Sequence, residues 1–397
     1  MRIAMISLHT SPADLPGEGD AGGMNVVERQ QADALAALGH EVLFLTRRTD
    51  PALPEVGELG PGVTLRQVEA GPARVVAKSA VSDHVEAFAE QLERLAEPVD
   101  VVHSQHWMSG VAGIGWARRL GVPHVQSFHS LAVPVGRELH EGEPAETEGR
   151  VAGERMLAQE SDLVVAISRA ECTTVLERCG ARPERVVVVP PGVDLQLFSP
   201  PAGRPADVEP PRGRGHGYVV FAARLQPLKA PDLAIAAVAG MPAEIRPHLV
   251  MVGGVSPDFA RYRSEVEQLV EQLGLTDWVT FSGPQDRQQL AQLLRGAGAL
   301  LVPSWSETFG LVALEAAASG TPVVAYDAGG LREAVVDGVT GVLVDSREPS
   351  DWSAALARVT APGTRETMSA AARAHAERFT PELAGERLLR CYQELLR

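Results

Sequence analysis

The chain is poor in cysteine and has no long apolar run. Its three cysteines, Cys172, Cys179 and Cys391, lack the spacing of metal ligands, and the odd count speaks against a disulfide framework. Residues 1–7 hold a single arginine and a short apolar stretch, so no secretory leader is expected, and no stretch reaches the roughly 18 apolar residues of a membrane span. These absences predict a protein of the reducing cytoplasm, with no membrane partner.

Positive charge is also scarce. The 36 Lys and Arg residues face 51 Asp and Glu residues, which gives a net charge of −15 and speaks against a nucleic-acid partner. A few placed cations can still bind a small anion. The 45% hydrophobic and 22% charged residues are ordinary for a folded protein, and 397 residues are enough for about two or three domains.

The first half of the chain alternates short apolar strands with helices. Strands are expected at residues 3–7, 41–46, 99–103, 125–128, 163–167 and 186–189, and helices at 26–38, 85–95 and 154–159. This alternation is typical of a parallel, doubly wound sheet. A stretch rich in Pro and Gly at 199–217 has no periodicity and is expected to be a linker.

The alternation restarts after the linker. Strands are expected at 218–222, 249–252, 279–281, 300–302 and 323–325, and helices at 230–238, 261–273, 288–295, 311–318 and 381–396. The predicted fold class is therefore α/β, with two Rossmann-like parallel-sheet domains that face a cleft. We expect domains at 1–198 and 218–380, and a C-terminal helical segment, 381–397, that packs back on the first domain.

The segment 304–319 is the strongest candidate for chemistry. A strand delivers Glu307 in a loop, and Phe309, Gly310 and Leu311 then lead into a helix that carries Glu315. Free N–H groups at a helix start favour phosphate or sugar hydroxyls, and the two carboxylates can accept hydrogen bonds from hydroxyl groups. The alternative is an acid that complements the helix dipole and an exposed helix glutamate.

Two further groups suit an anionic ligand. Arg224 and Lys229 follow the first strand of the second domain, where a planar fork and a point charge suit a pyrophosphate, although a solvated basic loop is the plain alternative. Gly23 and Asn25 lie in a GGMN segment before a helix, where small residues let the backbone approach a ligand. A lone pair of glycines before a helix is weak evidence.

Three histidines lie at expected strand ends of the first domain. His103 and His106 belong to the segment VVHSQHW, and His129 to QSFHSL. No third or fourth ligand follows at a useful spacing, so a zinc site is not expected. Each histidine has the plain alternative of a loop residue whose ring is hydrogen-bonded within the fold.

Taken together, these segments resemble the retaining glycosyltransferases of the two-Rossmann (GT-B) type, family 4. The hallmark of that family is a glutamate followed after seven residues by a second, here Glu307 and Glu315, and the segments PPGVDLQLF, RLQPLKAPD and SGTPVVAYDAGGLREAV extend the similarity over nearly the whole chain. The resemblance implies a UDP-sugar donor, no metal and no other cofactor.

The resemblance also implies roles for particular residues. Arg224 and Lys229 would hold the donor pyrophosphate, and Glu315 the ribose. The donor sugar would lie between Glu307, the backbone of 309–311 and His129, with Gly23 and Asn25 close by. The residues expected to act in catalysis are Arg224, Lys229, Glu307 and His129.

The opening residues look closest to actinobacterial enzymes that glycosylate cyclitols. An acceptor-phosphate pocket of that group maps onto Lys78, His106, Ser130 and Arg150, where His replaces Tyr and Ser replaces Thr. Because of these departures, and because five glutamates of one loop suit a cationic acceptor, the preferred prediction is an aminoglycoside-type acceptor containing 2-deoxystreptamine. Those glutamates are Glu138, Glu141, Glu143, Glu146 and Glu148.

The alternative acceptor is 1L-myo-inositol 1-phosphate, which would receive N-acetylglucosamine as in mycothiol biosynthesis. A UDP-sugar 2-epimerase and a non-catalytic sugar-binding protein are more remote alternatives. A homodimer is left open.

Overall fold

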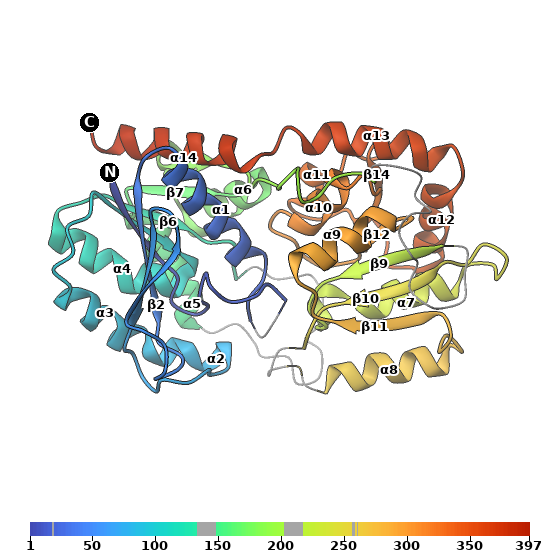
Figure 1. The fold of residues 1–397 in the computed structure, drawn as a ribbon, viewed down its shortest axis with the longest axis horizontal. Helices are drawn as coiled ribbons and strands as arrows, with labels where there is room; N and C mark the ends of the chain where they lie inside the picture. Colours follow the sequence, from blue (N-terminus) through green and yellow to red (C-terminus); the bar gives the residue numbers. More distant parts are fainter. Residues whose placement is uncertain (18–19, 133–147, 202–216, 256–258, 260) are drawn as a thin grey trace.

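The computed structural model describes residues 1–397 except 18–19, 133–147, 202–216, 256–258 and 260. Two α/β domains lie side by side, and the C-terminal helices run along the top of both (Figure 1). This arrangement confirms the predicted fold class. No helix among the described residues combines the length and the apolarity that crossing a bilayer requires.

The first domain is built on an eight-stranded sheet. Its strand order is β3-β4-β2-β1-β5-β6-β7-β8, and every pair is parallel except β3 with β4. The strands are β1 (Arg2–Ile6), β2 (Glu41–Arg47), β3 (Val56–Gly60), β4 (Val63–Val68), β5 (Val101–Gln105), β6 (His124–Ser127), β7 (Leu163–Ala166) and β8 (Val186–Val188).

Helices cover both faces of this sheet. One apolar cluster lies under α3, α4, α5 and α6, and includes Phe88, Trp116 and Leu157. The helices are α1 (Gly23–Ala37), α2 (Lys78–Val81), α3 (Val85–Arg94), α4 (His106–Leu120), α5 (Glu148–Glu160) and α6 (Arg169–Cys179).

The second domain has a six-stranded, wholly parallel sheet. The strand order is β11-β10-β9-β12-β13-β14. Its strands are β9 (Tyr218–Ala222), β10 (His248–Val252), β11 (Val279–Gly283), β12 (Leu300–Val302), β13 (Val323–Tyr326) and β14 (Gly341–Val344). Its helices are α7 (Pro231–Ala239), α8 (Tyr262–Gln272), α9 (Arg287–Gly296), α10 (Leu311–Ala318), α11 (Leu331–Ala334), α12 (Pro349–Thr360) and α13 (Thr364–Ala376).

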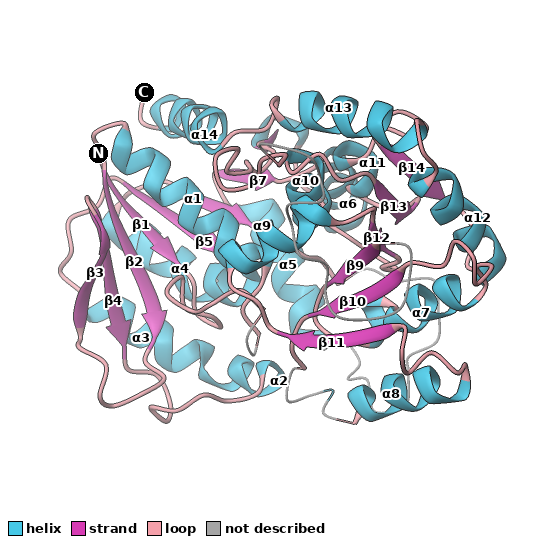
Figure 2. Ribbon diagram, turned by 45° about the vertical axis from the view of Figure 1, so that its right-hand side comes forward, coloured by secondary structure: helices cyan, strands magenta, loops and turns pink. Residues whose placement is uncertain are grey.

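The last helix, α14 (Pro381–Leu395), returns to the first domain, where it lies along α1 (Figure 2). Its residues Leu388 and Tyr392 are fully buried in the apolar cluster on that face of the first sheet. The Tyr392 hydroxyl lies 2.6 Å from Nδ1 of His103 in β5. His103 is therefore part of the core, which agrees with the alternative that its ring is hydrogen-bonded within the fold.

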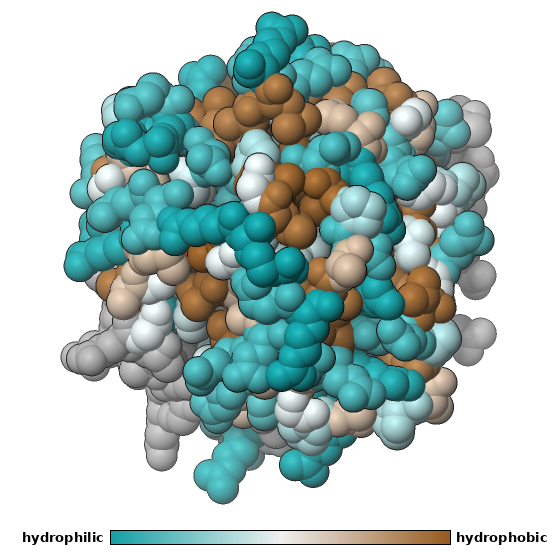
Figure 3. Space-filling view, turned by 90° about the vertical axis from the view of Figure 1, so that its left-hand side faces the viewer, coloured by the Kyte–Doolittle hydropathy of each residue, from teal (hydrophilic) through white to brown (hydrophobic). Residues whose placement is uncertain are grey.

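The outer face of the first domain is covered mainly by hydrophilic side chains, with small scattered apolar patches (Figure 3). Scattered apolar residues are normal on a protein surface and mark no docking site by themselves.

The contact between α14 and α1 requires a glycine at 385. A Cβ placed there would lie 2.5 Å from the Cβ of Ala34. Gly385→Ala is expected to destabilise the first domain by about 1–2 kcal/mol, because overpacking outweighs the gain in helix propensity. Denaturant unfolding measures this change. In an Ala34→Gly background the same substitution should be close to neutral, and an equal loss in both backgrounds would contradict the packing argument.

Candidate active site

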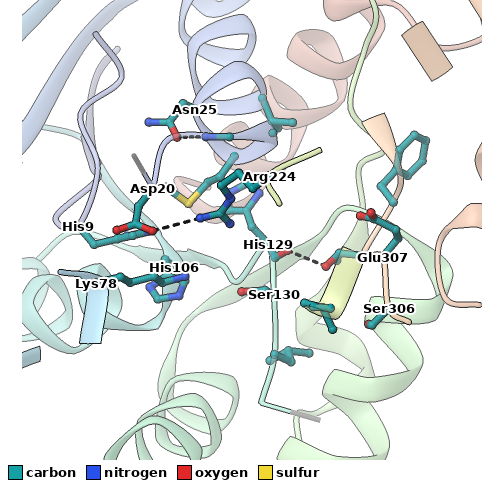
Figure 4. Close-up of a pocket in the computed structure, with 18 of the residues that line it drawn as sticks. His9, Asp20, Asn25, Lys78, His106, His129, Ser130, Arg224, Ser306 and Glu307 are labelled. Carbon is teal, nitrogen blue, oxygen red and sulfur yellow. Dashed lines mark hydrogen bonds and ion pairs between the residues drawn. The ribbon is translucent and has the colours of Figure 1, made fainter. Parts of the chain in front are cut away.

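A cavity of about 450 Å³ lies between the two domains (Figure 4). The first domain lines it with the loop after β1, the starts of α1 and α4, α2, and the loop after β6. The second domain contributes the loop after β9, the 3₁₀ turn Pro227–Lys229 and residues 306–311, which end at the first residue of α10. These are mostly carboxyl ends of parallel strands, where open α/β sheets bind ligands.

The cavity collects nearly all the residues that the sequence put forward. The lining includes Gly23, Asn25, Lys78, His106, His129, Ser130, Arg150, Arg224, Lys229, Glu307, Phe309, Gly310 and Leu311. Glu315 is the exception among the candidates. It lies on α10 behind the lining and is 3% exposed, and Nη1 of Arg287 donates to it at 2.8 Å. Burial raises the pKa of Glu315 against the opposing effect of Arg287.

Lys229 and Glu307 form a short ion pair on the second-domain wall. Nζ of Lys229 lies 2.6 Å from Oε1 of Glu307, which also accepts from Oγ of Ser304 at 2.8 Å. Both side chains of the pair are largely buried. The pair places a cation and a carboxylate beside the N-terminus of α10, where free backbone N–H groups point outward.

Two glycines outside the cavity lining hold the Glu307 loop in place. The backbone N–H of Gly330 donates to the carbonyl of Glu307 at 2.9 Å. A Cβ at Gly330 would lie 2.1 Å from the carbonyl oxygen of Thr308, and one at Gly329 would lie 2.3 Å from that of Glu307. The GG pair in the segment DAGGLRE therefore lets two backbones touch, a role that the sequence analysis did not assign.

Arg224 forms an ion pair across the cleft. Its Nη1 lies 3.1 Å from Oδ1 of Asp20, which belongs to the loop of the first domain before α1 (Figure 4). Asp20 was not among the residues expected from the sequence. In this structure each of the two cations expected to hold a diphosphate is therefore matched by an acid.

The start of α1 is open toward the cavity. A Cβ on Gly22 or Gly23 would meet no atom within 4 Å. The amide group of Asn25, by contrast, is buried and already bonded: Oδ1 accepts from Gly22 N at 3.0 Å, and Nδ2 donates to Ser11 O at 2.8 Å. Asn25 lines the cavity but fixes the loop in this structure, which differs from the expected direct approach to the ligand.

His129 follows β6 in a left-handed backbone conformation, with φ +60°. Its Nε2 lies 2.6 Å from Oε1 of Gln105. Because an amide oxygen only accepts, the ring donates from Nε2 and keeps Nδ1 as an acceptor. Burial lowers the pKa of His129 to about 4, so the ring is neutral at pH 7.

The first-domain wall opposite Glu307 is basic. Lys78 and His106 lie beside each other there (Figure 4), and Nη2 of Arg150 donates to Oγ of Ser130 at 3.1 Å. The ring of His9 packs against that of His106, with centroids 4.2 Å apart and ring planes tilted by 38°. His106 is 1% exposed and has φ +72°. Left-handed backbone at a bulky residue is strained and is common at functional sites.

His9 was not among the residues expected from the sequence. The positions of the lysines, which also point to this cavity, were not used either. Lys78 and Lys229 are the only lysines among the 36 Lys and Arg residues of the chain. Both line this one cavity, one on each wall. All other members of this set are arginines. An ammonium group is a compact and strongly hydrated charge, whereas a guanidinium group is a planar fork.

The described residues contain no group of three or more His, Cys, Asp or Glu side chains arranged to hold a metal ion. The charged side chains that line the cavity are Lys78, Arg150, Arg224, Lys229, Asp20 and Glu307.

Two family profiles match the chain. Glycosyltransferase Family 4 matches residues 21–197, and Glycosyl transferases group 1 matches residues 208–375. The D-inositol 3-phosphate glycosyltransferase of Kribbella flavida is 43% identical over 99% of this chain and 95% of its own, and that of Nocardiopsis dassonvillei is 42% identical over 94% and 90%. The chain is thus a glycosyltransferase and belongs to family 4.

Solved structures agree with this placement. The sucrose-phosphate synthase of Thermosynechococcus elongatus superposes with a TM-score of 0.91 at 31% identity, over 99% of this chain and 98% of its own. The Anabaena protein HepE, solved in complex with UDP and glucose, shares the fold with a TM-score of 0.77 at 21% identity, over 99% of this chain and all of its own (100%). The expected GT-B architecture is confirmed.

The preferred prediction of an aminoglycoside acceptor is wrong. Relatives at 40–43% identity that span nearly the whole chain are named D-inositol 3-phosphate glycosyltransferase, and none of these names points to aminoglycosides. Glu138, Glu141, Glu143 and Glu146 of the acidic loop lie outside the described residues, and the wall that is described carries Lys78 and Arg150. Those side chains would repel a polycationic acceptor.

A buried carboxyl under the β1 loop makes stability depend on pH. Glu28 is fully buried, accepts from Ser7 Oγ at 3.1 Å, and has a pKa raised to about 8 by burial. Between the ordinary pKa and this value the folded chain keeps a proton that the unfolded chain releases, so stability falls as pH rises through that window.

We therefore expect wild type to lose stability between pH 5 and pH 8 relative to Glu28→Gln, by at most about 1.4 kcal/mol per pH unit. Denaturant unfolding across this range measures the difference, with the exposed Glu86→Gln as control. Parallel curves for wild type and Glu28→Gln would contradict it.

The ion pair of Asp20 with Arg224 predicts competition with the donor. Asp20→Asn removes the acid that occupies Arg224, so UDP is expected to bind about fivefold more tightly, equivalent to about 1 kcal/mol. Titration calorimetry with UDP checks this, and the exposed Asp33→Asn should leave the affinity unchanged. Weaker binding in Asp20→Asn would mean that Asp20 supports the donor instead of competing with it.

Proposed function

We propose that this enzyme transfers a sugar from a UDP-sugar to D-inositol 3-phosphate, which is the same compound as 1L-myo-inositol 1-phosphate. The observation that carries the proposal is the basic first-domain wall with Lys78 and Arg150, in a chain whose relatives at 40–43% identity bear that name. A phosphate monoester carries nearly two negative charges at neutral pH, and such a wall complements it.

The donor side of the cavity supports the same proposal. Arg224 and Lys229 face the cleft within one lining, next to the start of α10. A fork, a point charge and free backbone N–H groups together suit a diphosphate. N-acetylglucosamine is the sugar that the resemblance to mycothiol-pathway enzymes implies, and UDP its carrier.

In the proposed reaction an acceptor hydroxyl oxygen attacks the anomeric carbon from the side that the diphosphate leaves. The bond between the anomeric carbon and the diphosphate oxygen breaks, that oxygen takes the proton of the hydroxyl, and the configuration is retained. Arg224 and Lys229 stabilise the negative charge that develops on the leaving group, without a metal ion. Glu307 and neutral His129 orient the sugar.

Substrate use tests the proposal most directly. Mass spectrometry of reactions with UDP-N-acetylglucosamine should show a glycoside of inositol phosphate, and none of free inositol or 2-deoxystreptamine. Lys78→Gln should raise KM for inositol phosphate about 10- to 100-fold, because it removes a charged hydrogen bond worth roughly 1.5–3 kcal/mol, and should leave KM for the donor unchanged. A product formed only with 2-deoxystreptamine would overturn the assignment.

The charge-stabilising role of Lys229 has a separate test. Lys229→Ala should lower kcat/KM by roughly 30- to 1,000-fold, the equivalent of about 2–4 kcal/mol of transition-state stabilisation. Lys229→Arg should restore little, since a planar guanidinium does not match the compact ammonium at 2.6 Å from Glu307. Steady-state kinetics with and without a chelator completes the test. Wild-type turnover in Lys229→Ala, or loss of wild-type activity with chelator, would contradict the mechanism.

A further inference from the structure

The ring of His129 is held by a side chain that lies outside the cavity lining. This side chain is Gln105, the last residue of β5, which is fully buried. Its Oε1 lies 2.6 Å from Nε2 of His129. The other polar atom of each side chain, Nε2 of Gln105 and Nδ1 of His129, is buried and has no hydrogen-bond partner among the described residues. Within that part of the chain, the contact with Gln105 is therefore the one hydrogen bond of the imidazole.

Gln105 extends from a rigid part of the first sheet. β5 pairs in parallel with β1 on one side and with β6 on the other, and Gln105 lies opposite Ser127 of β6. His129 follows Ser127 after one intervening residue. A side chain on a strand that is paired along both edges holds its partner more precisely than a side chain on a loop does.

The backbone of His129 is held separately, from the second domain. Oγ1 of Thr308, in the Glu307 loop, donates to the carbonyl oxygen of His129 at 2.7 Å, and His129 has φ +60°. The freedom that remains to this residue is rotation of the ring about its two side-chain bonds and the choice of the nitrogen that carries the proton. Gln105 restricts both, because its amide oxygen only accepts: the ring has to turn Nε2 toward it and keep the proton there.

The opposite tautomer does not suit this geometry. With the proton on Nδ1, the lone pair of Nε2 would face Oε1 of Gln105, and two acceptors at 2.6 Å repel each other. Burial lowers the pKa of His129 to about 4, so the ring is neutral at pH 8 and carries its proton on one of the two nitrogens.

We infer that Gln105 is a positioning residue for sugar transfer: it fixes the orientation of the His129 imidazole in the cavity wall and keeps the proton of that ring on Nε2. The inference rests on the proposed function only in requiring a nucleotide-sugar donor beside His129. Gln105 lies outside the cavity lining and is not placed to touch a substrate. Its effect on the reaction passes through the ring of His129.

The tautomer can be measured without any substrate. Nitrogen-15 NMR of histidine-labelled enzyme at pH 8 distinguishes protonated from unprotonated ring nitrogens, and the His129→Asn variant identifies the signals of His129. Wild type should show one tautomer, with the proton on Nε2. Gln105→Met keeps the length of the side chain but removes the acceptor, so both tautomers should be populated. A proton on Nδ1 in wild type, or a single unchanged tautomer in Gln105→Met, would overturn the inference.

A double-mutant cycle gives the kinetic test. Gln105→Met should lower kcat about tenfold while KM for the donor stays within about twofold, because a turning ring disturbs the bound sugar and leaves the diphosphate contacts in place. In a His129→Asn background, which tolerates the left-handed backbone, the same substitution should have almost no further effect. Additive losses in the double variant, or a loss confined to donor KM, would count against the positioning role.

Gln67→Met is the matched control, since Gln67 is a buried glutamine of β4 outside the cavity lining, and it should behave as wild type in both measurements. Where Gln105→Met lowers the fraction of folded protein, Gln105→Asn keeps the amide but draws it back by one methylene. The same loss of kcat and the same mixture of tautomers are expected there.

Release of UDP from the donor without any acceptor is a further readout. Like the NMR signals, it reports on His129 whichever acceptor the enzyme uses, so an absence of transfer to inositol phosphate would refute the proposed function alone. Equal UDP release by wild type and Gln105→Met would refute the positioning role alone.

Discussion

The site depends on keeping positive charge in a cleft before the substrate arrives. Arg224 and Lys229 lie largely buried between the domains, and an unpaired buried cation would be costly. Each is matched by an acid, Asp20 from the opposite domain and Glu307 from its own. Under the proposed function, a diphosphate that enters the cleft would meet cations already in place, and it would replace Asp20 as the partner of Arg224.

The same pairing of buried cations with acids explains how the two walls differ. The second-domain wall pairs its cation with Glu307, which suits a ligand with both charge and hydroxyl groups. The first-domain wall pairs Arg150 with buried Glu154, yet still presents Arg150, Lys78 and the neighbouring rings of His9 and His106 to the cavity. Burial and the neighbouring Lys78 lower the pKa of both histidines. They stay neutral at pH 7, and the lysine and arginine supply the charge that a phosphate needs.

Much of this could be predicted from the sequence, because parallel strands are short, apolar and buried. The ranges 218–222, 300–302 and 311–318 agree with β9, β12 and α10 to the residue. The antiparallel edge strand β3 was missed because none of its residues is fully buried and its apolar pattern is weak. Helix α4 was missed because glycines break its pattern. One of these glycines, Gly110, is required by packing, because a Cβ there would lie 2.0 Å from Oε1 of Gln126.

The negative charges of one glutamate-rich loop were not enough to predict the acceptor from the sequence. Charge along the chain does not say which side chains face the cleft. The contact of the His9 ring with His106 is seen only when the loop after β1 and the start of α4 are brought together. Asp20 escaped notice for the same reason, because its partner Arg224 lies 204 residues away in the chain. The presence of only two lysines, both in segments that line the cavity, was a signal that the sequence did contain.

Those lysines also provide the most direct measurement. An amine-directed reagent that acetylates accessible amines can react only with Met1, Lys78 and Lys229, and peptide mass spectrometry follows each one separately. The account predicts that UDP-N-acetylglucosamine slows modification of Lys229, that inositol phosphate slows modification of Lys78, and that the reaction at Met1 is unaffected. Protection of neither lysine by either substrate would contradict a cleft that binds the donor diphosphate on one wall and the acceptor phosphate on the other.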